Sequence, residues 1–266
     1  MKNMRRLANW VLSTLKPINE GNYSDTHVPL SSIFYAAYVL DKLGVEFDRK
    51  RLINYLSINR KSISDVYASF YFIKTTQLLG MRLGSKERQR FIVAALQAIN
   101  KLKSHRFSNR AEILYMSAYV LHSLGYRKLD DARRIVLSLK KHSNLETTYF
   151  VVETLNLLKH SLNEMKETLN FVISLQNADY GFSSTPKSFS HFIEDAYYGF
   201  RILELFGVSM DKNKLEENLK FVWRCQNHDG GFKRTEVGGI SLPENCFYAI
   251  NILEIISHMM HDRGDG

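Results

Sequence analysis

An internal repeat with a period of 50 residues is the feature that most limits how this chain can fold. Residues 171–203 recur without a gap as residues 221–253. The residues that are identical in the two copies include, numbered in the first copy, Phe171, Val172, Gln176, Asn177, Asp179, Gly181, Phe182, Glu194, Tyr198 and Leu203. Each copy predicts a helix that ends near the Gln, a loop in which Asp and Gly form turns, and a second helix rich in aromatic residues. The repeated unit is therefore a pair of helices.

Four weaker copies of the second helix precede these two, so the pattern occurs six times. When the copies are aligned on Asp195, an aromatic residue stands two positions later in every copy. These aromatic residues are Phe34, Phe70, Tyr115, Tyr149, Tyr197 and Phe247. A glutamate precedes the aligned position in four copies, at Glu112, Glu146, Glu194 and Glu244. The shared alignment predicts six equivalent helices.

More highly charged helices are expected between the aromatic ones. Their approximate ranges are 3–16, 48–58, 86–102, 129–141, 163–176 and 212–226. Lys and Arg are interspersed among leucines that recur at helical spacing. Each helix should therefore bury its leucine stripe and expose its charged face. The aromatic helices are apolar over a wider arc and should form an inner ring. The sequence therefore predicts an all-α fold of six helical hairpins. The wide apolar arc is one reason to expect an α/α toroid in place of an open solenoid of paired helices, and the loop motif described below is the other.

Nothing in the composition divides the chain into domains. It has 266 residues, 45% of them hydrophobic, and 4 prolines, with no Pro-, Gly- or Ser-rich linker, which predicts a single domain over residues 1–266. The two cysteines, Cys225 and Cys246, lack the spacing of a disulfide framework or a metal site, which favours a reducing, cytoplasmic setting. A membrane-spanning helix needs about 18 consecutive apolar residues. The sequence contains no run of this kind, so no such helix is expected.

The formal net charge of +9 favours anionic partners. A diphosphate, an acidic peptide or a membrane surface would each satisfy it, so peripheral membrane contact is one expectation. The sequence contains no recognisable nucleic-acid-binding module, and no nucleic acid is expected as a partner.

The loop motif of the last two copies resembles that of a known family. Residues 226–232 read Gln-Asn-His-Asp-Gly-Gly-Phe, and residues 176–182 are a weaker copy. The motif resembles the repeat of protein prenyltransferase β subunits and is similar to the Gln-to-aromatic motif of squalene and other terpenoid cyclases. The resemblance implies an α/α toroid in which the Gln joins neighbouring helix ends through hydrogen bonds and the aromatic residue packs over the turn.

The resemblance also implies where a catalytic zinc ion would bind, and the residues at those positions do not suit zinc. They are Asp195, Tyr197 and Tyr248, where zinc-dependent prenyltransferases have Asp, Cys and His. Tyrosine is a poor zinc ligand, and Cys246 lies one residue out of register. We therefore expect no metal ion and no other cofactor, and zinc-dependent protein prenylation is not expected.

The family binds the diphosphate of its substrate with a Tyr, a His and several basic residues. The Tyr matches Tyr198, whereas Thr147 and Tyr115 replace an expected His and Arg. Lys187 and Arg234 are nearby bases that we expect to hold the diphosphate with Tyr198, and inner-helix N-termini would add their dipoles. The alternative is that both bases are solvated surface charges.

Aromatic side chains on the inner helices predict an isoprenoid-binding cavity on the toroid axis. The residues expected to contact the ligand are Tyr115, Tyr149, Tyr197, Tyr198, Phe247 and Tyr248. About half of all the inner-helix aromatic residues should face the axis, and the alternative is that they fill it as a closed core. Asp195 and Glu244 are the catalytic candidates, although carboxylates in a first helical turn are also favoured by the helix dipole.

Two functions remain open at this point. The first is a prenyltransferase-like protein that binds an isoprenoid lipid or its diphosphate, as a zinc-independent transferase or cyclase. The second is a noncatalytic interaction module that binds a protein partner. An open central cavity would favour the first, and a filled axis with an exposed apolar patch would favour the second.

Overall fold

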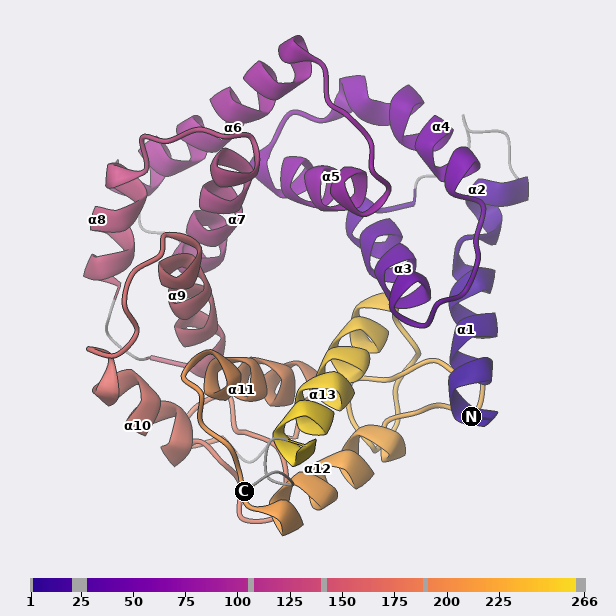
Figure 1. Ribbon diagram of the computed structural model, residues 1–266, viewed down its shortest axis with the longest axis vertical. Coiled ribbons are helices and arrows are strands. Elements are labelled where there is room, and N and C mark those ends of the chain that lie inside the picture. The colour runs from indigo at the N-terminus through magenta and orange to yellow at the C-terminus, as the bar shows by residue number, and fades with distance from the viewer. Residues whose placement is uncertain (1, 21–27, 105–107, 140–142, 189–190, 262–266) are drawn as a thin grey trace.

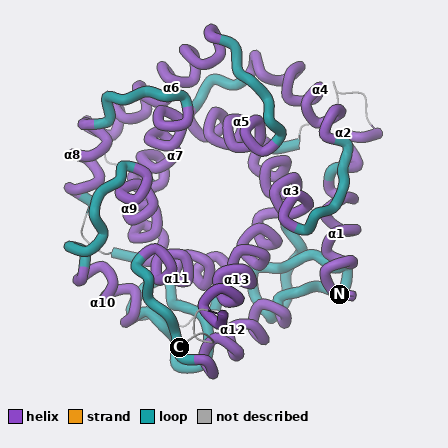
Figure 2. The backbone as a smooth tube through the Cα atoms, in the orientation of Figure 1, coloured by secondary structure: helices purple, strands orange, loops and turns teal. Residues whose placement is uncertain are grey.

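The structure is a computed structural model, and it describes residues 2–20, 28–104, 108–139, 143–188 and 191–261. Within these ranges the chain consists of helices and loops (Figure 2), and the helices form two concentric rings (Figure 1). The inner ring contains α3 (Leu30–Lys42), α5 (Val66–Leu78), α7 (Arg110–Ser123), α9 (Leu145–Leu157), α11 (Ile193–Leu205) and α13 (Pro243–His261). The outer ring contains α1 (Lys2–Thr14), α4 (Arg49–Asn59), α6 (Ser85–Ser104), α8 (Asp130–Ser138), α10 (Lys166–Ser174) and α12 (Lys212–Arg224), with the short helices α2 (Lys16–Glu20) and η1 (Arg60–Ser62) beside them.

This architecture confirms the predicted all-α toroid. Each of the six predicted outer ranges overlaps an observed outer helix, although residues 140–141 of the fourth range lie outside the described residues. Each inner helix contacts the next one along the chain, and the last inner helix, α13, contacts the first, α3. An open solenoid would leave α13 and α3 apart, so the closed ring excludes that alternative.

Burial follows the difference in composition between the two rings. In the outer helix α8, Ala132, Ile135 and Val136 are buried, while Arg133 and Arg134 are exposed. The inner helix α9 buries an unbroken run of residues, 148–155. The outer helices therefore shield one face of the inner ring, as an amphipathic stripe permits. In the part of the chain that the structure describes, every helix is too short or too polar to span a bilayer.

Local sequence fixes where the inner helices begin and end. At the start of α5, the side chain of Asp65 accepts a hydrogen bond from the backbone N–H of Ala68 at 2.8 Å, which caps the helix. After α5, Gly80 takes the left-handed conformation, with φ 68°. At the equivalent place after α9, Lys159 has φ 53° and is the one non-glycine residue of the described chain with positive φ. The loop therefore keeps its shape even where glycine is absent.

The motif at residues 226–232 closes the outer ring against the first helix. The Nε2 atom of Gln226 donates hydrogen bonds to the backbone oxygen of Asn3 in α1, at 3.1 Å, and to that of Gly230, at 2.9 Å. Gly230 lies so close to α1 that an added Cβ would come within 2.5 Å of the backbone oxygen of Arg6. The Gln thus links neighbouring units by hydrogen bonds, and here it joins the last unit to the first.

Replacing Gly230 by Ala is expected to weaken this closure. Gly230 has φ 102°, which L side chains rarely adopt, and the new Cβ would press on the backbone of Arg6. We expect the free energy of unfolding, measured by urea denaturation, to fall by about 3 kcal/mol. Gly238 is the matched control, because it has φ 69° but nothing within 4 Å of an added Cβ. Gly238→Ala should cost about 1 kcal/mol, and equal losses in the two variants would contradict the role given to Gly230.

Candidate functional site

A cavity of about 630 Å³ lies within the inner ring, and side chains from all six inner helices line it. The lining includes the aromatic residue of the shared alignment from every copy: Phe34, Phe70, Tyr115, Tyr149, Tyr197 and Phe247. It also includes the aromatic residues that follow them, namely Tyr35, Tyr71, Phe150, Tyr198 and Tyr248. We expected about half of these rings to face the axis. All of them line the cavity, because two successive helix positions, about 100° apart, can both border it. The rings surround open space and do not fill the axis.

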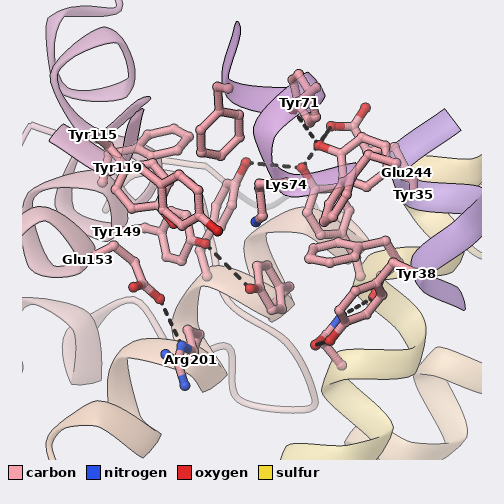
Figure 3. Close-up of a pocket in the computed structure, with 18 of the residues that line it drawn as sticks. Tyr35, Tyr38, Tyr71, Lys74, Tyr115, Tyr119, Tyr149, Glu153, Arg201 and Glu244 are labelled. Atoms are coloured by element: carbon pink, nitrogen blue, oxygen red, sulfur yellow. Dashed lines mark hydrogen bonds and ion pairs between the residues drawn. The ribbon is translucent and has the colours of Figure 1, made fainter. Parts of the chain in front are cut away.

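Tyrosine hydroxyls and one glutamate form a chain of hydrogen bonds between α5, α3, α13 and α11 (Figure 3). The hydroxyl of Tyr35 lies 2.7 Å from that of Tyr71 and donates to Oε1 of Glu244 at 3.1 Å. Tyr248 donates to the same Glu244 oxygen at 2.9 Å, and its hydroxyl lies 3.4 Å from that of Tyr198. Burial raises the pKa of all four tyrosines, so their hydroxyls stay protonated and able to donate.

Carboxylates gather where α7, α9 and α13 begin. Glu112, Glu146 and Glu244 lie in the first turns of these helices and line the cavity. Burial raises the pKa of Glu112 and of Glu146, and the negative charge of Glu244 adds to both increases. The fourth aligned glutamate, Glu194, forms an ion pair with Arg234 instead. The N-terminal end of the cavity is therefore acidic, the opposite of what a diphosphate requires.

One helical turn after the shared aromatic residues, the lining becomes more polar. The residues four positions later are Tyr38, Lys74, Tyr119, Glu153, Arg201 and Asn251, and all line the cavity. Arg201 donates from Nε to Glu153 at 2.8 Å and from Nη1 to Glu204 at 2.6 Å. Sequence reasoning missed Lys74 and Glu153. Extending the aromatic alignment by one helical turn would have found both.

Lys74 projects from α5 into the space between the tyrosines of α3 and those of α7 and α9 (Figure 3). Its Nζ atom lies 4.6 Å from the ring centre of Phe34, 5.1 Å from that of Phe70 and 5.4 Å from that of Tyr119. Rings at these distances attract the ammonium group. Burial lowers the pKa of Lys74 to about 8, and the charge of Glu153 partly opposes this effect. Lys74 is therefore mostly protonated at pH 7.

Of the residues that were expected to hold a diphosphate, one lies in the cavity wall. Tyr198 lines the cavity and stacks on Tyr149, with ring centres 4.5 Å apart. Lys187 is exposed and is not among the residues that line the cavity. Arg234 does not line the cavity either. It pairs with Glu194, and its Cζ atom lies 3.9 Å from the centre of the Phe192 ring. Of the three predicted diphosphate ligands, Tyr198 thus lines the cavity and the two bases do not.

The positions that the resemblance assigns to zinc do not fit a zinc site. Asp195 accepts a hydrogen bond from Ser184 at 2.6 Å and lies outside the cavity lining, whereas Tyr197 and Tyr248 line the cavity. Burial raises the pKa of Cys246 to about 12, so this residue is a thiol and not a metal-binding thiolate. Among the described residues, no group of three His, Cys, Asp or Glu side chains is arranged to hold a metal ion. Zinc prefers thiolate, imidazole and carboxylate donors, and this set does not supply them.

The ring of helices and its aromatic cavity define a toroid of the prenyltransferase type. A family model for the prenyltransferase alpha-alpha toroid domain matches residues 47–261, and the chain belongs to this family. Among solved structures, the fold is similar to that of Candida albicans protein geranylgeranyltransferase-I complexed with GGPP, with a TM-score of 0.71. That match has 16% sequence identity and covers 95% of this chain and 92% of the other, so it shows the shared fold. A comparison with curated proteins found no match.

Replacing Asp195 by Asn should change how stability depends on pH. Burial raises the pKa of Asp195 to about 6, although the hydrogen bond from Ser184 lowers it in part. Because the folded state binds this proton more tightly than the unfolded chain, its contribution to stability is largest below the ordinary Asp pKa of about 4 and is lost as the pH rises through about 6.

Asp195→Asn should therefore gain stability relative to the unmodified protein by about 2 to 3 kcal/mol between pH 4 and pH 7.5. Urea denaturation of both proteins at pH 4, 6 and 7.5 measures the difference. Groups such as Glu112 titrate in both proteins, so the comparison isolates position 195. A difference that stays constant across the three pH values would contradict the assignment.

Proposed function

We propose that this protein binds an isoprenoid in its central cavity. The observation that carries the proposal is a set of eleven aromatic rings that surround a cavity of about 630 Å³. Nearly every inner helix contributes two of these rings, from adjacent positions. Small-molecule sites typically have volumes of roughly 300–1,000 Å³. Ring faces bind the carbons of a polyene by dispersion, and they also attract positive charge.

The similar solved structure supports the same proposal through its fold. The toroid of Candida albicans protein geranylgeranyltransferase-I was solved with GGPP, an isoprenoid diphosphate. A protein with a similar fold therefore binds an isoprenoid. In the present chain the aromatic side chains of the inner ring supply apolar surface for such a ligand.

The geometry supports binding more directly than chemistry on a diphosphate. A transferase or cyclase that releases diphosphate needs cations beside the leaving group. Lys187 and Arg234 do not line the cavity, and the zinc positions do not fit zinc. Glu244 is the catalytic candidate that reaches the cavity, held by two tyrosine hydroxyls, whereas Asp195 is bound to Ser184 outside it.

One observation favours the alternative of a protein-interaction module. Val237, Ile240 and Leu242 are 84%, 73% and 42% exposed in the loop that leads into α13. Exposed apolar residues that lie close together in a loop are typical of docking surfaces for a partner chain. This surface lies on the loop, and it does not compete with a ligand in the cavity.

Farnesol should bind with a dissociation constant in the micromolar range, and geraniol at least tenfold more weakly, because each buried CH₂ contributes about 0.8 kcal/mol. Isothermal titration calorimetry measures both affinities, and chelation of metal ions with EDTA should not change them. Tyr197→Leu removes one ring from the cavity wall and should weaken farnesol binding about tenfold.

Tyr126→Leu is the matched control, because Tyr126 is half-buried but does not line the cavity. It should leave farnesol affinity within about threefold of the original value. Absence of farnesol binding, or equal losses in the two variants, would contradict binding in the cavity. Capture of a partner protein by the loop at Val237 would then become the function to pursue.

A further inference from the structure

The wall of the cavity carries a charge opposite to that of the whole chain. The protein has a formal net charge of +9, yet six glutamates and three Lys or Arg residues line the cavity. They are Glu112, Glu146, Glu153, Glu204, Glu244 and Glu254, against Lys42, Lys74 and Arg201. A multiply charged anion such as a diphosphate would lose its hydration and meet mostly carboxylates. The cavity therefore disfavours a diphosphate head group.

Two of the three cations are already neutralised by neighbouring carboxylates. Lys42 forms an ion pair with Glu254 at 2.7 Å. Arg201 pairs with Glu153 at 2.8 Å and with a second glutamate one turn further along its own helix. Among the cavity-lining Lys and Arg residues that the structure describes, Lys74 alone has no ion pair. One positive charge is thus free to meet a ligand.

Aromatic rings surround the ammonium group of Lys74, and its N–H donors form no hydrogen bond with an oxygen of the described residues. Three ring faces, those of Phe34, Phe70 and Tyr119, surround Nζ at 4.6 to 5.4 Å. An ammonium has three N–H donors, and aromatic faces satisfy them only weakly. A ligand oxygen could therefore form charge-assisted hydrogen bonds with Lys74 that the protein itself does not supply.

Lys74 is also well separated from the acidic end of the cavity. In the common alignment it stands seven residues after the glutamate positions, which corresponds to about 10 Å along a helix. An anionic group at Lys74 is thus away from Glu112, Glu146 and Glu244. Tyrosine and phenylalanine rings occupy the wall between the two levels and can contact an apolar chain.

We infer that the ligand of this cavity is an isoprenoid that carries a single carboxylate, and that Lys74 selects it by forming a salt bridge with that carboxylate. The inference rests on the proposed function and adds the head group and the residue that recognises it. A neutral isoprenoid alcohol leaves the ammonium unpaired, and a diphosphate brings more negative charge than one lysine balances.

Calorimetry at pH 7 with farnesoic acid, farnesol and farnesyl diphosphate tests the inference. The unmodified protein should bind farnesoic acid at least tenfold more tightly than farnesol or farnesyl diphosphate. A hydrogen bond to a charged group lowers the dissociation constant by at least about tenfold. Lys74→Met should weaken farnesoic acid binding about tenfold or more and change farnesol binding by less than about threefold. Lys128→Met is the matched control, because Lys128 is exposed and does not line the cavity, and it should keep the preference.

Each outcome separates this inference from the proposal beneath it. Farnesol binding without a preference for the acid, or tighter binding of the diphosphate, overturns the role of Lys74 and leaves isoprenoid binding standing. Failure of the unmodified protein to bind farnesol and farnesoic acid overturns both. Thermal unfolding followed by circular dichroism checks that Lys74→Met is folded. If it is not, Lys74→Gln replaces it, and the same loss of preference is expected.

Discussion

Contact between α13 and α3 is the constraint on which the rest of the structure depends. Three polar contacts join these helices, which are more than 200 residues apart in the chain. Tyr35 donates to Glu244, the hydroxyl of Tyr38 donates to Asn251 at 2.8 Å, and Lys42 pairs with Glu254 at 2.7 Å. Because the ring is closed and its helices share one alignment, equivalent side chains lie at similar depths around the axis. The cavity wall is thus divided into an acidic level, an aromatic level and a mixed polar level.

Much of the fold could be predicted because it is periodic. The repeated Gln-to-Phe loops mark where helices stop, and helical spacing of leucines marks the outer faces. Lys159 shows the strength of this periodicity, since it takes the left-handed conformation that glycine has after most other inner helices. Ring closure was harder to predict, because the contacts of Gln226 and Gly230 with α1 join opposite ends of the sequence.

The site could be predicted only in part, because its electrostatics depend on pairings between helices. The aligned aromatic residues indicated the cavity wall, and the structure places every one of them there. Arg234 looked like a free base in the sequence, but it pairs with Glu194, 40 residues away. Lys74 attracted no notice in the sequence, yet among the described Lys and Arg residues that line the cavity it alone is left without an ion pair. Whether a lysine or arginine is paired depends on carboxylates from other helices and loops, and residue spacing along one helix does not reveal those contacts.

Binding of an isoprenoid inside the inner ring is the central claim, and a crystal structure of the protein with bound farnesol tests it most directly. The account predicts electron density for the chain on the toroid axis, in contact with Tyr149, Tyr197 and Phe247, with the three ring residues close to their present positions. Density for farnesol only on the outer helices or on the loop at Val237, with the axis occupied by solvent alone, would contradict it.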